Sequence, residues 1–193
     1  MHVLPTAYPL HAPSLPSPRP SQDFVAQSPA MEAASPAYKP ARTGRLQQRY
    51  DDQGCRLLTG TVPLITAGDG SISVVMVKSK RRSDWTLPKG GWEDDESAEE
   101  GAAREAYEEA GVLGKVGARL GTFEFSSRSN PGRTNRLTMF LLKVDEVLKE
   151  WPEDERDRTM VTLTEAMATA ARPEVAAALK AAAAQVEVGL EMG

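Results

Sequence analysis

Carboxylates crowd one stretch of this sequence, residues 90–112. Nine Asp and Glu side chains lie between Glu93 and Glu109, and Arg104 is the single cation among them. Like charges at this density repel one another unless something neutralises them. A divalent cation would do so, because carboxylate oxygens are ligands that such ions prefer. We therefore interpret the stretch as a metal-loaded catalytic loop and helix, although charge alone favours an ordinary solvated helix face.

Residues 97–110 carry the signals of a helix with defined ends. Ser97 can cap the first turn, and Glu100 three residues later completes a capping box. Gly111 suits the position after the last helical residue. At about 100° per residue, the sequence predicts two opposite faces. The buried face would hold Ala102, Ala103, Ala106, Tyr107 and Ala110, and the acidic face Glu105, Glu108 and Glu109.

The three glutamates of the acidic face are the candidate metal ligands. Glu105 and Glu109 are one helical turn apart with Glu108 beside them, which predicts an oxygen site for Mg²⁺, with Mn²⁺ as an alternative. Backbone carbonyls near Lys89 and Gly90 can supply a further ligand. A metal held there can polarise a bond that water attacks, while one glutamate acts as general base.

Two nearby residues have supporting roles in this interpretation. Arg104 lies four residues before Glu108 and can orient a glutamate that its neighbours would otherwise repel. Glu96 either supports this group from behind or only shapes the loop, and the sequence leaves both alternatives open.

The rest of the chain is interpreted as scaffold and substrate clamp. Outside residues 93–109 it has 22 basic and 18 acidic side chains, a balance that suits a highly anionic ligand. Residues 1–43 hold nine of the 14 prolines and are expected to be disordered, residues 44–186 to form one domain, and residues 187–193 to be a flexible tail. The single cysteine, Cys55, indicates a reducing compartment. We expect a monomer in the cytoplasm, with the nucleus as a further location.

Hydrophobic periodicity and turn residues predict the other elements. Strands are expected at residues 57–67, 72–78, 116–125, 136–144 and 158–163, and further helices at 164–171 and 174–186. No apolar run approaches the ~20 residues needed to span a bilayer.

The acidic stretch also resembles a family motif, the Nudix box. The matching positions are Gly90, Glu96, Arg104-Glu105-Ala106, Glu108-Glu109 and Gly111-Val112. The resemblance implies the Nudix fold, an α/β architecture with a mixed β-sheet sandwiched between α-helices. It also implies hydrolysis of a nucleoside diphosphate linked to another group, with Glu108 as general base and Glu109 as the alternative.

The flanks resemble one group of this family, the diphosphoinositol polyphosphate phosphohydrolases in their fungal-type form. The shared segments are residues 85–91, 104–111, 114–115 and 147–151. The resemblance implies removal of the β-phosphate from diphosphoinositol polyphosphates and cleavage of diadenosine polyphosphates, often with inorganic polyphosphate as well. It implies substrate contacts at Arg49, Arg56, Lys78, Ser79, Lys80, Lys89, Gly90, Gly91, Arg133, Asn135, Arg156 and Arg172. Two positions depart from the pattern: Asn135 replaces a family histidine, and Leu58 a basic residue.

Two other functions remain open. A nucleotide-restricted Nudix pyrophosphatase would act on dinucleoside polyphosphates, NDP-sugars or an RNA cap, although few aromatic residues lie near the box to stack on a base. A non-catalytic inositol-polyphosphate-binding module would have lost box glutamates, and none is lost. The expected partner is therefore a small polyphosphate, with no membrane and no nucleic acid other than capped RNA.

Overall fold

The computed structural model describes residues 41–42, 44, 46–80, 84–127 and 131–191, without the side chains of 189–191. The prediction of disorder for residues 1–43 therefore falls almost wholly outside the described residues. In the part that is described, no helix is long and apolar enough to cross a membrane.

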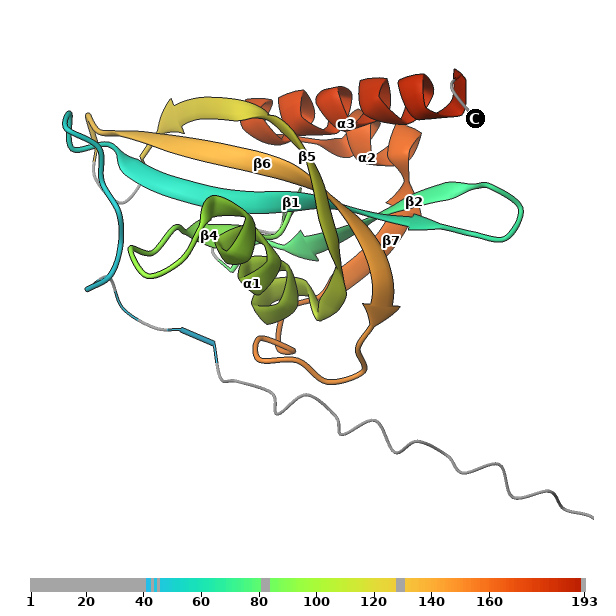
Figure 1. The fold of residues 1–193 in the computed structure, drawn as a ribbon, viewed down its shortest axis with the longest axis horizontal. Coiled ribbons are helices and arrows are strands. Elements are labelled where there is room, and N and C mark those ends of the chain that lie inside the picture. Colours follow the sequence, from blue (N-terminus) through green and yellow to red (C-terminus); the bar gives the residue numbers. More distant parts are fainter. Residues whose placement is uncertain (1–40, 43, 45, 81–83, 128–130, 192–193) are drawn as a thin grey trace, which may run out of the picture. The chain divides into compact units, whose positions relative to one another are not determined.

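A seven-stranded mixed sheet forms the centre of the fold (Figure 1). The main path of hydrogen-bonded strands runs β3-β2-β1-β6-β5, while β4 pairs with β1 and β7 with β2. β1 and β6 run parallel, and the other pairs are antiparallel. The strands are β1 (Arg56–Thr66), β2 (Ile72–Lys78), β3 (Trp85–Thr86), β4 (Lys89–Gly91), β5 (Val112–Ser126), β6 (Thr134–Val147) and β7 (Arg158–Thr162).

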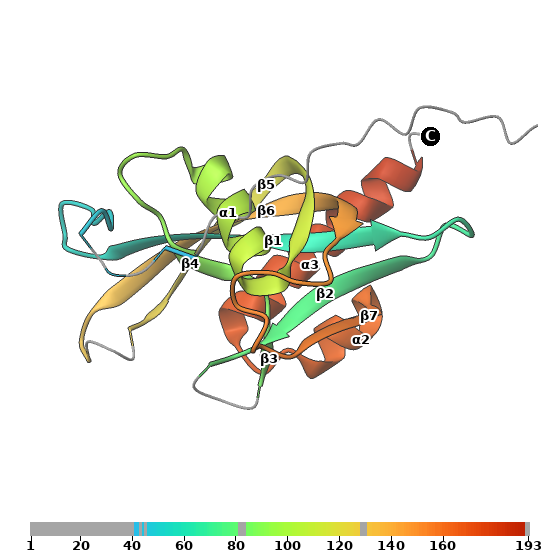
Figure 2. The ribbon, with the colours of Figure 1, turned by 90° about the horizontal axis from the view of Figure 1, so that it is seen from below.

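Helices cover both faces of this sheet. α1 (Ala98–Ala110) lies on one face, and α2 (Leu163–Thr169) and α3 (Pro173–Glu191) lie on the other (Figures 1 and 2). The buried apolar residues divide accordingly. One cluster joins Val75 and Leu142 to Ala106 of α1, and the second joins Val62 to Leu179 of α3. The predicted α/β fold, a mixed sheet between helices, is confirmed.

The structure differs from the predicted elements at several places. β3 is not among the expected strands, and β5 and β6 extend beyond their expected bounds at both ends. Two further differences concern residues 89–91 and helix α3. Residues 89–91, expected as loop, form β4, whose backbone pairs with Leu58, Thr59 and Gly60 of β1. A three-residue strand carries no measurable periodicity, so the sequence pattern could not reveal it. Helix α3 also continues past residue 186 to Glu191, and Glu187, Leu190 and Glu191 in this last stretch are good helix formers.

The ends of α1 are those that the sequence predicts. The Ser97 side chain accepts a hydrogen bond from the Glu100 N–H, and the Glu100 carboxylate accepts one from the Ser97 N–H. Gly111 ends the helix in the left-handed conformation, with φ of 58°. The N–H of Gly111 closes the last turn on Tyr107. Both ends of the helix that carries the acidic residues are thus fixed locally.

The predicted division of α1 into opposite faces is wrong in one respect. Glu105 and Glu109 are buried together with Ala102, Ala106 and Ala110. On a helical wheel these positions span one continuous arc, because Glu109 is only about 20° from Ala102. The acidic residues therefore border the packed face rather than oppose it, and the carboxylates of all three, Glu108 included, are largely withdrawn from solvent.

Arg158 fastens the carboxyl end of α1 to the rest of the domain. From β7 its guanidinium donates to the carbonyl of Ala110 at 2.7 Å and to that of Leu148 at 2.9 Å. It also stacks over Trp151, 4.2 Å from the ring centroid. Helix α1 has no basic residue in its own last turn, so Arg158 supplies the cation that the negative end of the helix dipole favours.

We expect Gly111→Ala to lower the free energy of unfolding by about 1–3 kcal/mol. The new Cβ would be forced into a left-handed residue and would lie 2.8 Å from the Trp151 ring. Urea denaturation monitored by circular dichroism measures the change. Gly68→Ala is the matched control, because a Cβ there meets nothing within 4 Å. Equal stability of the two variants would contradict this account of the joint.

Candidate active site

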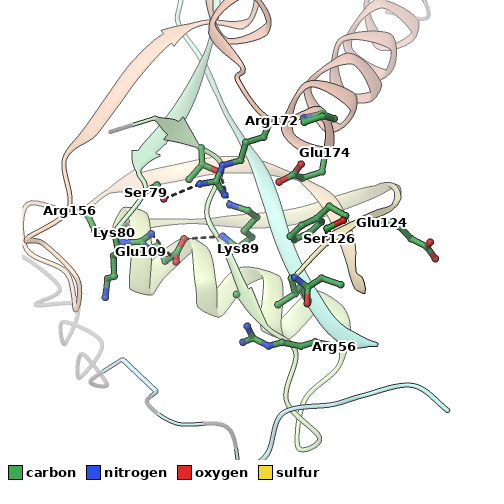
Figure 3. A pocket seen from close by; sticks show the side chains of 16 residues that line it. Arg56, Ser79, Lys80, Lys89, Glu109, Glu124, Ser126, Arg156, Arg172 and Glu174 are labelled. Carbon is green, nitrogen blue, oxygen red and sulfur yellow. Dashed lines mark hydrogen bonds and ion pairs between the residues drawn. The ribbon is translucent and has the colours of Figure 1, made fainter. Parts of the chain in front are cut away.

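A cavity of about 730 Å³ lies where β1, β4, α1 and the start of α3 meet (Figure 3). Of the residues that the structure describes, five with cationic side chains and three with carboxylates line it, together with a single aromatic residue. The lining residues are Arg56, Leu58, Ser79, Lys80, Thr86, Lys89, Gly90, Glu109, Glu124, Phe125, Ser126, Asn135, Arg156, Arg172, Pro173 and Glu174.

Arg104 holds the acidic stretch together. Its guanidinium makes a two-point contact with the Glu96 carboxylate at 2.8 and 2.9 Å. It also donates to Glu105 at 2.8 Å and to Glu108 at 3.2 Å. A further bond, at 2.8 Å, reaches the carbonyl of Gly91 in β4. The structure thus gives Arg104 the orienting contacts that the sequence predicts, and it gives Glu96 a supporting role behind them.

Glu105 lies buried against the backbone of β4. Burial, and next to it the charge of Glu109, raises the pKa of Glu105 to about 8 although Arg104 opposes the shift. A Cβ at position 90 would lie 2.2 Å from both Glu105 carboxylate oxygens. Only glycine at this position leaves room for the carboxylate, which explains why a glycine stands there in physical terms.

Glu109 is the glutamate of α1 that reaches the cavity. Its carboxylate accepts a hydrogen bond from the Lys89 N–H at 3.1 Å and forms an ion pair with Arg156 at 2.8 Å. Burial raises its pKa, while the charges of Arg156 and Lys89 oppose the rise. Its position between the loop backbone and a cavity cation suits a group that handles a proton or a metal ion.

Glu108 points to a different place. It does not line the cavity; its oxygens accept from Arg104 and from the Arg42 N–H, the latter at 3.2 Å. Burial raises the pKa of Glu108, and Arg104 opposes that shift. The three predicted metal ligands therefore do not all face one point, because residues 108 and 109 leave the helix about 100° apart.

The donor set nonetheless fits a hard divalent cation. Glu105 and Glu109 are two buried carboxylates, and the charge of Glu109 raises the pKa of Glu105. A dication would relieve that repulsion. Within the described residues, no three acidic, His or Cys side chains are gathered as ready ligands. Arg104 and Arg156 are the counter-ions instead. Glu109 would therefore have to exchange Arg156 for the ion.

The structure gathers eight of the twelve predicted substrate contacts around the cavity. They are Arg56, Ser79, Lys80, Lys89, Gly90, Asn135, Arg156 and Arg172. Arg56 and Asn135 face each other as partners in the parallel pairing of β1 with β6. The pairing of β1 with β6 thus brings together two predicted substrate contacts that are far apart in the sequence.

Arg49 and Gly91 lie outside the cavity and serve the acidic loop instead. The Arg49 guanidinium stacks over Trp92 at 4.7 Å from its centroid. It also donates to the carbonyls of Glu93 and Asp94, both at 2.8 Å. The Gly91 carbonyl is occupied by Arg104. In this conformation both residues hold the loop in place.

Lys78 and Arg133 also lie outside the cavity. Lys78 forms an exposed ion pair with Asp157 at 2.8 Å. Arg133 donates to the carbonyl of Gly54 at 3.3 Å. Exposed contacts of this kind contribute little to stability, so both side chains can leave them at small cost.

Most cavity cations are already paired with protein groups. Arg172 contacts Asp84 at 2.8 Å and donates to Ser79 at 3.0 Å. Lys80 contacts Glu153 at 2.7 Å, and the same carboxylate lies 3.1 Å from Arg156. These pairs keep the cations in position but also reduce the net positive charge that a ligand would meet.

Lys89 differs from these three cations in the groups that it contacts. Its ammonium is buried and donates to two neutral oxygens, Thr86 Oγ1 at 2.6 Å and the Leu87 carbonyl at 3.2 Å. Burial lowers the pKa of Lys89 to about 8, while Glu109 opposes the shift. An anionic ligand in the cavity would relieve this desolvation, so Lys89 is the cation with most to gain from a bound phosphate.

Sequence reasoning missed two residues of this site. Gln48 donates to the carbonyls of Leu57 and Trp92 and accepts from the Arg56 Nε at 2.7 Å, so it fixes Arg56. Glu174 faces the cavity from the first turn of α3. Neither carries a local signal, since a glutamine before a strand and an acid at a helix start are both ordinary.

We expect the free energy of unfolding, measured with a chelator present, to fall as the pH rises from about 5 to 8. Between the ordinary Glu value of 4.5 and about 8, folded protein retains a proton on Glu105 that the unfolded chain has released. Raising the pH therefore disfavours folding, by up to about 1.4 kcal/mol per pH unit for one group. Glu105→Gln should flatten this slope in urea titrations across the same range. Parallel slopes for the two proteins would contradict the burial of an uncharged Glu105.

We expect Arg156→Gln to destabilise the protein by roughly 3 kcal/mol, because it leaves Glu109 buried without its cation. Added Mg²⁺ or Mn²⁺ should then raise the melting temperature more in the variant than in the unaltered protein, since the ion no longer competes with Arg156. Lys80→Gln is the control, because Lys80 pairs with Glu153 and not with Glu109. An equal response to metal in both variants would show that Arg156 does not occupy the metal position.

Comparison with known proteins places this geometry in a family. The NUDIX domain profile matches residues 57–182. Nudix hydrolase 16, mitochondrial, of Arabidopsis thaliana is 43% identical over 148 residues, which are 69% of this chain and 82% of that protein. Diphosphoinositol polyphosphate phosphohydrolase 3-alpha of Mus musculus is 44% identical over 81 residues, 42% of this chain and 47% of that protein.

Solved structures show the same fold. The C. elegans Ap4A hydrolase has a TM-score of 0.56 and 20% identity, covering 67% of this chain and 97% of that one. The similarity to plant Nudix hydrolases, the domain match and the shared fold agree with one another. Nudix hydrolases generally use divalent metal ions such as Mg²⁺, which the carboxylates of α1 fit. The chain belongs to the Nudix hydrolase family.

Proposed function

We propose that this protein hydrolyses phosphoanhydride bonds in diphosphoinositol polyphosphates and diadenosine polyphosphates, with Mg²⁺ as the metal. The observation that carries the proposal is the composition of the cavity wall. Among the described residues, five cations line the cavity together with Glu109, and Phe125 is the single aromatic residue of the lining. A dense polyanion needs several Lys and Arg side chains, whereas a site that selects a nucleobase needs stacking surfaces.

The position of the cations supports cleavage of a phosphate chain. Arg156 and Lys80 lie on one side of Glu109, and Arg56 lies on the other side of the cavity (Figure 3). If cations on both sides of the cavity bind a chain of phosphates, one of its anhydride bonds would lie next to Glu109. The names of the mouse diphosphoinositol polyphosphate phosphohydrolase and the C. elegans Ap4A hydrolase agree with substrates of this kind.

We assign the proton transfer to Glu109 rather than Glu108, since Glu109 is the one in the cavity. Its carboxylate would take a proton from water as the water oxygen attacks phosphorus. The bridging P–O bond then breaks, and its electron pair leaves with the remaining phosphate. Lys89 and Arg156 would stabilise the charge on the phosphoryl oxygens. A divalent ion held by Glu105 and Glu109 would supply Lewis acidity to the anhydride.

Arg104 is a positioning residue in this scheme. It holds Glu105 and the Gly91 carbonyl at 2.8 Å each and so sets the distance between α1 and β4. The Lys89 N–H, next to this contact, fixes one oxygen of Glu109 at 3.1 Å. Together these bonds leave the other Glu109 oxygen on the side of Arg156 and the cavity.

A substrate panel tests the proposal. With Mg²⁺ we expect orthophosphate release from a diphosphoinositol pentakisphosphate and cleavage of diadenosine pentaphosphate. Glu109→Gln should lower kcat by about 10²–10⁴-fold, because an amide cannot accept the proton, while substrate binding measured by calorimetry survives. Glu108→Gln should have the smaller effect on kcat.

Each other outcome has a distinct meaning. Cleavage of diadenosine polyphosphates, NDP-sugars or capped RNA without release from the inositol substrate would replace the proposal by a nucleotide-restricted pyrophosphatase. Binding of inositol polyphosphates without turnover of any substrate would point to a binding module. Unchanged turnover in Glu109→Gln would overturn the choice of base.

A further inference from the structure

Glu174 is a buried carboxylate that faces the cavity. It is the second residue of α3 and is 8% exposed. In the described part of the chain no hydrogen bond or ion pair to its carboxylate is found, and Figure 3 shows it directed into the cavity. A buried charge normally has a partner, so its free oxygens call for a donor that comes from a ligand.

The cations near Glu174 are committed elsewhere. Arg172 is held by Asp84 at 2.8 Å and by Ser79 at 3.0 Å. The Lys89 ammonium donates to Thr86 and to the Leu87 carbonyl. Both cations lower the cost of burying the Glu174 charge, as does the amino end of α3, yet neither uses its acceptor sites.

The charge of Glu174 restricts what can occupy this part of the cavity. A phosphate placed there would meet a fixed negative charge, and like charges brought together repel one another. A hydroxyl would donate a hydrogen bond to the same oxygens, and bonds to charged acceptors are the stronger class. The part of the cavity next to the Glu174 carboxylate therefore selects a hydroxyl and rejects a phosphate.

We propose that Glu174 is a specificity-determining residue that accepts a hydrogen bond from a free hydroxyl of the substrate. The inference rests on the proposed function, because it takes the ligand to be a phosphorylated polyol whose phosphates occupy the cationic wall. A substrate with one hydroxyl free on its ring then fits better than one in which every hydroxyl carries phosphate.

A pair of substrates that differ in one phosphate tests this. The probes are the diphosphoinositol tetrakisphosphates, each with one free hydroxyl, and a diphosphoinositol pentakisphosphate, which has none. For the unaltered protein we expect kcat/KM to be higher for at least one of the hydroxyl-bearing isomers. Glu174→Gln should lower the ratio of the two kcat/KM values, that of the hydroxyl-bearing substrate over that of the fully phosphorylated one, roughly tenfold. The change should appear mainly as a lower KM for the fully phosphorylated substrate, with kcat little affected.

Two further variants separate specificity from folding. Glu187→Gln removes the same charge from an exposed position of the same helix, and it should leave the ratio unchanged. Glu174→Asp keeps the charge at the amino end of α3 but withdraws the carboxylate. Its ratio of kcat/KM values should therefore lie between that of the unaltered protein and that of Glu174→Gln. Melting temperatures measured by circular dichroism show whether each variant is folded.

The results distinguish the two proposals. If both inositol substrates are hydrolysed and Glu174→Gln changes them by the same factor, Glu174 only stabilises the helix and the inference is overturned. An effect of equal size in Glu187→Gln would overturn it as well, because general electrostatics would then suffice. If neither inositol substrate is hydrolysed while a diadenosine polyphosphate is, the proposed function fails and the inference falls with it.

Discussion

The guanidinium of Arg104 neutralises the buried acidic side chains on which the rest of the site depends. Glu96, Glu105 and Glu108 are all within hydrogen-bonding distance of it, and without it they would stand as buried like charges. The same group binds the Gly91 carbonyl, so the helix and the strand β4 are joined through the centre of the acidic cluster. The geometry of the loop, the burial of Glu105 and the position of the Lys89 N–H all depend on this joint.

A second constraint is that cations of the cavity are neutralised by carboxylates of the protein itself. Ion pairs join Arg156 to Glu109, Lys80 to Glu153 and Arg172 to Asp84. Such pairs hold long side chains in place and spare part of the entropy that a ligand would otherwise have to remove. Binding of the proposed polyanion would then exchange carboxylates for phosphates as partners of these cations. Selectivity would follow from which carboxylates can be exchanged, and Glu174, which forms no ion pair with the described residues, would remain as a fixed repulsion.

The sequence predicted well those structural features that depend on neighbouring residues. It did not predict features that depend on contacts between distant parts of the chain. The limits of α1 follow from Ser97, Glu100 and Gly111, which act within one turn, and the strands β1 and β2 follow from segments rich in apolar and β-branched residues on either side of a turn. The contact of Arg104 with Glu108 follows from helical spacing. In contrast, the approach of Arg156 to Glu109 depends on where the chain returns after β6. The presence of Glu174 in the cavity depends on α3 crossing the sheet. Residue types in a motif therefore identify the chemistry, while the exclusion of Glu108 and Arg49 from the cavity needs the fold.

The anchoring of α1 by Arg158 has a consequence for how the domain opens. Three chain segments meet at this side chain: the end of α1, the turn at Leu148 and the strand β7. The Glu153 N–H adds a bond to the Glu108 carbonyl in the same place. Segments that share their hydrogen bonds in this way exchange with solvent as one cooperative unit. Glu109 and Arg156 both belong to that unit, so the protein cannot loosen the loop that carries one without loosening the helix that carries the other. The Glu109 carboxylate and its Arg156 counter-ion are thus expected to be gained and lost together in local unfolding.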